Sequence, residues 1–96
     1  MNISNIDGNN YVEISPIKIK YYDTNEANYI MVRSILDNLI DSTTFYYVLV
    51  NIDITGSITN LDSGNIIMDG DDYSSWTGDN QYPFTWISSK LNITLV

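Results

Sequence analysis

SGNIIMDGDDYSSWTGDNQYPFTWISSKL, residues 63–91, joins a strand pattern to a helix pattern. Residues 65–69 read as a short strand, after which the period of the apolar residues changes towards that of a helix. Asp69 or Asp71 can cap a short helix that runs to Trp76, because an aspartate oxygen accepts hydrogen bonds from the first helical N–H groups. The stretch therefore predicts a corner at which a strand leads into helices.

A second helix is predicted from Pro83 to about residue 91. Asp72 is favourable near the positive end of the first helix, and Gly78 follows that helix. Proline suits the first turn of the second helix, where its missing N–H needs no partner. Asn92 is an acceptable left-handed stop. Two neighbouring rows of side chains follow from the helical period: Phe84, Ile87 and Leu91, and beside them Tyr82, Trp86 and Lys90.

The clearest strand precedes this corner, over residues 44–54. Its even positions form an unbroken apolar face of Tyr46, Val48, Val50, Ile52 and Ile54. Its odd positions are apolar only in the first half. This pattern predicts a central strand whose far end emerges into solvent.

Turns are predicted on both sides of the central strand. Residues 41–43, Asp-Ser-Thr, form the first turn. Gly56 permits a bend, and residues 60–64, NLDSG, match a type I turn with glycine at the left-handed position of a hairpin.

Residues 29–40 fit two kinds of element. As a helix, they have a possible capping box of Asp23 with Glu26 and an apolar stripe that includes Val32 and Leu36. As a strand, they alternate and are rich in β-branched residues. We interpret them as a strand.

Residues 11–22 read as a strand with a change of face at Pro16. Val12 and Ile14 share one face, and the apolar residues after the proline share the other. Proline cannot donate to a ladder, so a bulge at this point would reconcile the two sets. Residues 1–10 form an N-terminal arm or a short edge segment, and residues 93–96 add a last strand or a tail.

Together these elements predict one domain over residues 1–96. The fold class is mainly β (α+β): an antiparallel meander or small sandwich of about four to five strands, with one or two short C-terminal helices.

Composition narrows the possible chemistry. The chain has no cysteine and no histidine, so it lacks thiolate chemistry, the commonest general base and the commonest transition-metal ligand. We therefore expect no enzyme activity, catalytic residue, cofactor or metal. The formal charge of −8 opposes direct binding to nucleic acid or to anionic membranes. The first residues lack a secretory signal and no stretch is long enough to span a membrane, so we expect a soluble chain made in the cytoplasm.

Two clusters suggest ligands at first sight. Asp69, Asp71, Asp72 and Asp79 are grouped, but the twelfth position of a calcium loop counted from Asp69 is an asparagine. These aspartates are better explained as helix caps or as solvent-exposed charges. Trp76 and Trp86 could stack a sugar, although tryptophans at helical spacing more often join helices to a sheet. Asp69, Asp71, Asp72, Tyr73, Trp76 and Trp86 are therefore assigned to a structural corner.

Two tyrosine pairs are the candidate interface residues: Tyr21 with Tyr22, and Tyr46 with Tyr47. Neighbours on a strand point to opposite faces, so each pair places one ring on each face. Aromatic rings that are exposed on one face are typical of interface cores, whereas packing in the protein's own core is the default interpretation of both pairs.

The pattern Gly70-Asp71-Asp72-Tyr73, then Trp76, an acidic residue at Asp79 and a closing helix, resembles small structural proteins of tailed-bacteriophage virions. In those proteins a strand ends in a Gly-Asp/Glu-Asp-Tyr turn and a tryptophan. The strand pair that includes residues 45–50 is similar in position and character. Pro83 departs from the pattern, because an apolar helix residue is expected there.

The resemblance implies a virion component, synthesised in the host cytoplasm, that binds other virion proteins and forms a homo-oligomer. An acidic inhibitor that mimics DNA to block a host defence protein is the alternative, motivated by the charge. A carbohydrate-binding module that uses Trp76 and Trp86 is the second alternative.

Overall fold

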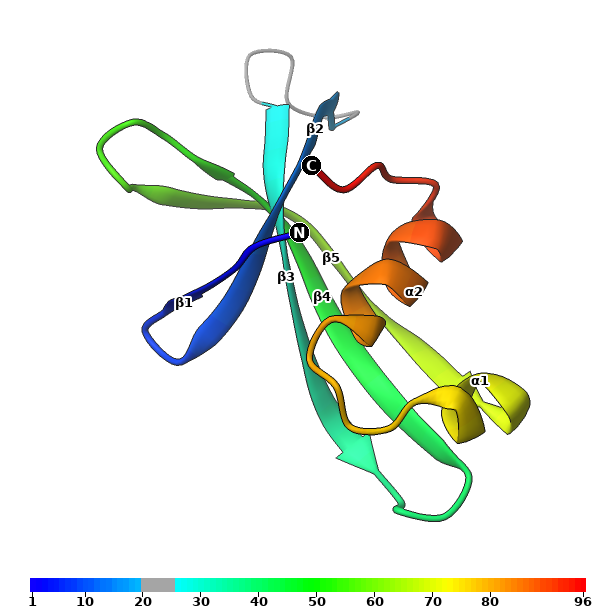
Figure 1. Cartoon of the computed structure of the whole chain (residues 1–96). Helices are drawn as coiled ribbons and strands as arrows, with labels where there is room; N and C mark the ends of the chain where they lie inside the picture. Colours follow the sequence, from blue (N-terminus) through cyan, green and yellow to red (C-terminus); the bar gives the residue numbers. More distant parts are fainter. Residues whose placement is uncertain (20–25) are drawn as a thin grey trace.

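The computed structural model describes residues 1–19 and 26–96, and it contains one antiparallel sheet followed by two short helices (Figure 1). The strands are hydrogen-bonded in sequence order, β1-β2-β3-β4-β5. The elements are β1 Ile3–Ile6, β2 Asn9–Lys18, β3 Glu26–Asp37, β4 Ser42–Ile52, β5 Ile58–Asp69, α1 Gly70–Ser75 and α2 Tyr82–Leu91. The predicted class, mainly β with a meander and short C-terminal helices, is confirmed. Within the described residues, no helix has the length and apolar character needed to cross a membrane.

The two faces of the sheet are covered differently. Figure 1 shows α1 and α2 on one side of β4 and β5, and the main apolar cluster lies between these helices and the sheet. This cluster includes Phe45 and Leu49 of β4 together with Phe84 and Ile87 of α2. A smaller cluster on the other face contains Tyr11, Met31, Val48 and Val50. Both faces of the first half of β4 are thus apolar, as the sequence pattern predicts.

The twist of the sheet brings side chains from two of its corners over the smaller cluster. Ile6 of β1 and the pair Ile52 and Ile58, at the far end of β4 and β5, pack against it. Figure 1 shows the β1–β2 hairpin and this far end of β4 and β5 on the side away from the helices. A right-handed twist brings the corners of a sheet over its own face in this way.

The irregularity predicted at Pro16 is present in β2. Glu13 pairs with Tyr29 and Ile17 pairs with Ala27, so β2 has two more residues than β3 between these pairs. The extra residues let the backbone accommodate a proline that cannot donate to the ladder.

The C-terminal segment pairs with β2 beside this irregularity. The Ser15 N–H donates to the Thr94 carbonyl at 2.9 Å, and the Val96 N–H donates to the Glu13 carbonyl at 3.1 Å. The segment therefore covers the part of β2 that the four-residue strand β1 does not reach.

The hairpin turn predicted at residues 60–64 is wrong, because β5 runs through these residues. The turn lies upstream, where the Asp53 carboxylate accepts hydrogen bonds from the Thr55 hydroxyl and from the Thr55 and Ser57 N–H groups. These bonds, above all that from the Thr55 hydroxyl, lower the pKa of Asp53 below its ordinary 3.8. Gly56 supplies the left-handed backbone of the turn, with φ 86°.

Gly64 has a packing role instead of a turn role. It pairs with Tyr47, and a Cβ added at Gly64 would lie 2.7 Å from the Tyr47 hydroxyl oxygen. The glycine thus leaves room for a tyrosine ring that lies over the edge strand.

Residues 29–40 are a strand over most of their length, which confirms the strand interpretation over the helix alternative, but β3 ends at Asp37. The turn predicted at residues 41–43 is displaced, since β4 already begins at Ser42. The Asn38 side-chain oxygen accepts hydrogen bonds from the N–H groups of Ile40, Asp41 and Ser42, which places the turn at residues 38–41.

The register of β5 predicts that truncations of two neighbouring side chains destabilise the fold by different amounts. Met68 is fully buried beneath the helices and Ile67 is 62% exposed on the other face. Met68→Ala should lower the free energy of unfolding by about 2–5 kcal/mol, because it leaves a cavity, and Ile67→Ala by less than about 1 kcal/mol. Urea denaturation of both variants measures the difference. Reversed effects would mean that the strand is shifted by one residue.

Candidate functional site

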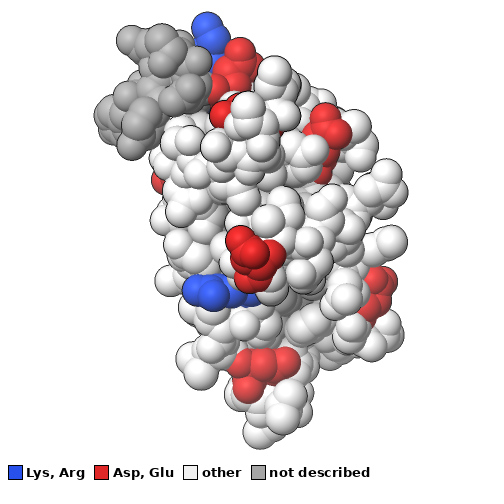
Figure 2. Space-filling view, turned by 90° about the vertical axis from the view of Figure 1, so that its left-hand side faces the viewer, with Lys and Arg blue, Asp and Glu red and all other residues white. Residues whose placement is uncertain are grey.

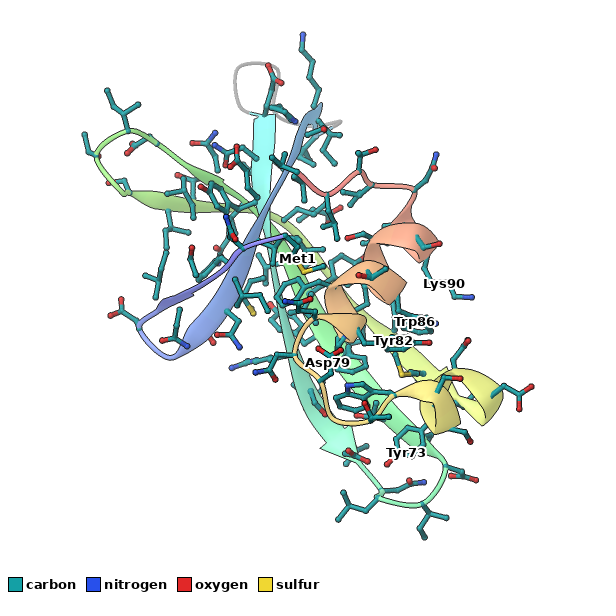
Figure 3. All side chains as sticks on the ribbon, in the orientation of Figure 1. Met1, Tyr73, Asp79, Tyr82, Trp86 and Lys90 are labelled. Carbon is teal, nitrogen blue, oxygen red and sulfur yellow. The ribbon has the colours of Figure 1, made fainter. Side chains whose placement is uncertain are left out.

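An aromatic cluster joins the C-terminal helices to the sheet. The Phe45 ring of β4 lies 5.3 Å from the Trp76 ring, edge to face, and 6.4 Å from the Trp86 ring (centroid distances). Tyr73 of α1 contacts Trp76 at 6.3 Å, also edge to face. Figure 3 shows Trp86 on α2 and Tyr73 near the end of the β3–β4 hairpin. The structure thus places both tryptophans between helices and sheet.

These tryptophans do not form a shared sugar platform. Trp86 is 9% exposed, and Lys90 of the same helix lies over its ring at 5.5 Å. Trp76 is half-buried, and its indole N–H donates to the Asp79 carbonyl at 2.8 Å. Stacking of a sugar needs an exposed ring face, and Trp86 is buried.

The acidic residues of the corner occupy the predicted positions without the predicted capping bond. Asp69 is the N-cap residue of α1, but its side chain makes no capping hydrogen bond. Gly70, which follows, has φ 56° and turns the chain sharply at the start of the helix. Asp71 and Asp72 lie in the first turn of α1, where a negative charge interacts favourably with the positive end of the helix dipole. Asp71 is therefore inside the helix and is not its cap either.

Asp79 organises the link between the two helices. Its carboxylate accepts a hydrogen bond from the Gln81 N–H at 2.6 Å, one residue before α2. Pro83 lies in the first turn of α2 and Asn92 ends the helix with φ 58°, as predicted. Over residues 1–19 and 26–96, no three acidic side chains are placed to hold a metal ion together.

Tyr73 connects α1 to the end of β3. Its hydroxyl donates to the Asp37 carboxylate at 2.8 Å. This hydrogen bond, together with partial desolvation and the negative charges of Asp37 and Asp41, raises the pKa of Tyr73 above its ordinary 10.0. The two carboxylates therefore lie near the phenol.

The candidate interface tyrosines of β4 are both half-buried. Tyr46 packs beside the smaller cluster, with the Arg33 guanidinium 5.2 Å above its ring. Tyr47 lies on the helix-covered face over Gly64. The rings are thus on opposite faces, as predicted. Tyr21 and Tyr22 lie outside the described residues, and all four stay interface predictions.

A groove of about 440 Å³ opens between the β1–β2 turn and the link from α1 to α2. Asn9, Asn10 and Asn80 line it together with Trp76 and Pro83. Arg33 and Ser34 add a guanidinium and a hydroxyl to this lining, which contains no carboxylate.

A second feature is an apolar surface at the free end of the β3–β4 hairpin, which we call the hairpin tip. Its exposed side chains are Ile35, Leu36, Leu39, Ile40 and Ile67. Leu36 and Ile67 both pair with Thr44, so they lie in one row across the sheet. The strand interpretation of residues 29–40 places Leu36 and Ile40 on one apolar strand face, so it does not predict this exposed surface. Asp37-Asn38, a turn-forming pair inside an apolar run, was the available signal.

The acidic side chains on one face of the molecule can be followed in Figure 2. In the face shown in Figure 2 the red side chains lie apart, separated by uncharged surface. They form no continuous acidic row on this face.

Comparison with known proteins gives no relative: no family model, curated protein or solved structure matches the chain.

The Tyr73–Asp37 contact predicts a perturbed titration. Asp37→Asn should lower the pKa of Tyr73 towards 10.0, because the charge that opposes phenolate formation is removed. Since the pKa is raised in the folded state, the contact stabilises the fold fully below pH 10.0, and this is lost as the pH rises through the folded-state pKa. NMR titration of ring-labelled tyrosine measures both values. An unchanged Tyr73 pKa in the variant would contradict the contact.

Proposed function

We propose that this chain is a non-enzymatic structural component of a bacteriophage particle, in the head, neck or tail, that acts by protein–protein assembly. The observation that carries the proposal is the hairpin tip. Leu36, Leu39 and Ile40 are 71%, 83% and 81% exposed, which is unfavourable in water unless a partner covers them.

The free edge of the sheet supports the same function. β5 is the last strand in the sheet and spans twelve residues. An exposed edge offers unpaired N–H and C=O groups, to which another chain can add a strand. A chain with both features is suited to a ring or lattice of copies together with other virion proteins.

The setting in a phage particle rests on the sequence resemblance of residues 63–91 and the preceding strand pair. The absence of His and Cys from the chain accords with a structural role. The acidic DNA mimic has only the charge of −8 in its favour, and a mimic of regularly spaced phosphates would need ordered rows of carboxylates.

Mass spectrometry of purified particles from a phage that carries this gene tests the proposal. We expect the chain among the stoichiometric virion proteins. Its absence from particles, while it is abundant in infected cells, would contradict the proposal.

A mass measurement by size-exclusion chromatography with light scattering separates the two functions. An assembly protein should form oligomers as its concentration rises. A monomer at every concentration that bound a basic host protein would favour the inhibitor.

A further inference from the structure

Side-chain hydrogen bonds hold the backbone of the turn at the hairpin tip. Besides accepting three backbone hydrogen bonds, Asn38 donates through its side-chain N–H groups to the Asp41 carboxylate at 2.8 Å and to the Ser42 hydroxyl at 3.2 Å. The Leu39 N–H donates to Asp37 at 2.8 Å. A turn fixed by these bonds loses little conformational entropy when a partner binds.

Leu39 is an unusual residue at its position. Its φ is 61°, in the left-handed region where glycine or asparagine is favoured and where other residues are strained by about 1–2 kcal/mol. A leucine that is both strained and 83% exposed gives no packing benefit within the chain. Its side chain can contribute favourably when another molecule covers it.

Several carboxylates lie at the same end of the sheet as this apolar surface. Asp37 and Asp41 belong to the hairpin itself, and Asp69 pairs with Ser42 at the end of β5. α1 begins at the next residue and adds two more, and it lies beside the end of the hairpin in Figure 1.

The basic side chains in the described part of the chain lie away from the hairpin tip. Lys18 ends β2, and Lys90 lies over Trp86. Arg33, the nearest along the chain, lies over the Tyr46 ring.

We propose that the hairpin tip binds a basic amphipathic segment of another protein, with apolar side chains against Leu39 and Ile40 and lysines or arginines against the aspartates at the same end of the sheet. Charge decides between this occupant and a second copy of the chain. Two copies that met tip to tip would bring two sets of carboxylates together, whereas a basic segment neutralises them. The proposal relies on the proposed function only for the assumption that the partner is a protein.

The probe is a fluorescein-labelled peptide of lysine and leucine at helical spacing, about four turns long. Fluorescence anisotropy measures its binding to the purified full chain. A glutamate–leucine peptide of equal length is the charge control, and it should not bind.

Leu39→Asn with Ile40→Ser is the test variant. Asparagine suits the left-handed backbone, so the melting temperature should stay the same or rise while binding weakens about tenfold or more through lost apolar contact. The matched control is Ile54→Ser, in the turn between β4 and β5, where the isoleucine is fully exposed. It should change affinity less than about twofold, within the usual effect of a neutral surface change.

A pair of charge variants tests the aspartates. Asp69→Asn with Asp71→Asn should weaken binding more than Asp7→Asn with Asp62→Asn, although both pairs remove the same charge and all four residues are exposed. The difference should shrink at high salt, where exposed charges are screened.

Four results would overturn the proposal: no binding of the lysine–leucine peptide, wild-type binding by the tip variant, an equal loss in Ile54→Ser, or an equal loss in both charge pairs. A wild-type dimer in sedimentation equilibrium that the tip variant abolishes would also overturn it, because the occupant would then be a second copy. The assay contains no phage particles, so its failure leaves the virion proposal standing, and absence from virions leaves a positive binding result standing.

Discussion

The packing of Phe45 against Trp76 and Trp86 is the contact on which the rest of the structure depends. A sheet of one layer must bury at least one face, and a chain of 96 residues has little material with which to do so. Phe45, 2% exposed, is the point where β4, the link between the helices and α2 meet. α1 follows β5 directly and α2 follows after residues 76–81, so this contact holds the link and α2 on one face of the sheet.

The same packing makes the two ends of the molecule different. The described parts of the chain have extents of 42 × 26 × 21 Å, and the hairpin tip lies at one end, beside α1 (Figure 1). The Tyr73–Asp37 hydrogen bond fixes α1 to that end. The helix thereby brings its aspartates close to apolar residues that come from β3, β5 and the turn. A surface suited to a basic partner thus follows from how the helices are held, although no single segment contains all of it.

Much of the architecture could be predicted from local patterns. The apolar strand pattern that begins at residue 44, the face change at Pro16 and the stop at Asn92 are consequences of backbone geometry within a few residues. The structure contains all three, although β4 ends at Ile52, two residues before the predicted end. The turn predicted at residues 60–64 is wrong because glycine serves close packing as well as tight turns. Gly64 makes room for Tyr47 on the neighbouring strand, a contact that becomes visible only once the register is known.

The hairpin tip was missed for a related reason. The strand interpretation of residues 29–40 places Ile40 on an apolar strand face, whereas the Asn38 hydrogen bonds show that Leu39 and Ile40 lie in a turn. Similarly, Asp69 has the sequence position of a helix cap, but the backbone at Gly70 turns before the side chain can act as one. Patterns locate elements well, whereas the exposure of their ends depends on side-chain hydrogen bonds and on the three-dimensional register.

The most direct test of this account is a nuclear Overhauser measurement between the Phe45 ring and the two indoles in solution. The account predicts cross-peaks from Phe45 to both Trp76 and Trp86, together with the cross-strand contact between Tyr47 and Gly64. A sheet that kept the Tyr47–Gly64 contact but gave no cross-peak from Phe45 to either tryptophan would contradict it, because the helices would then not be held on that face.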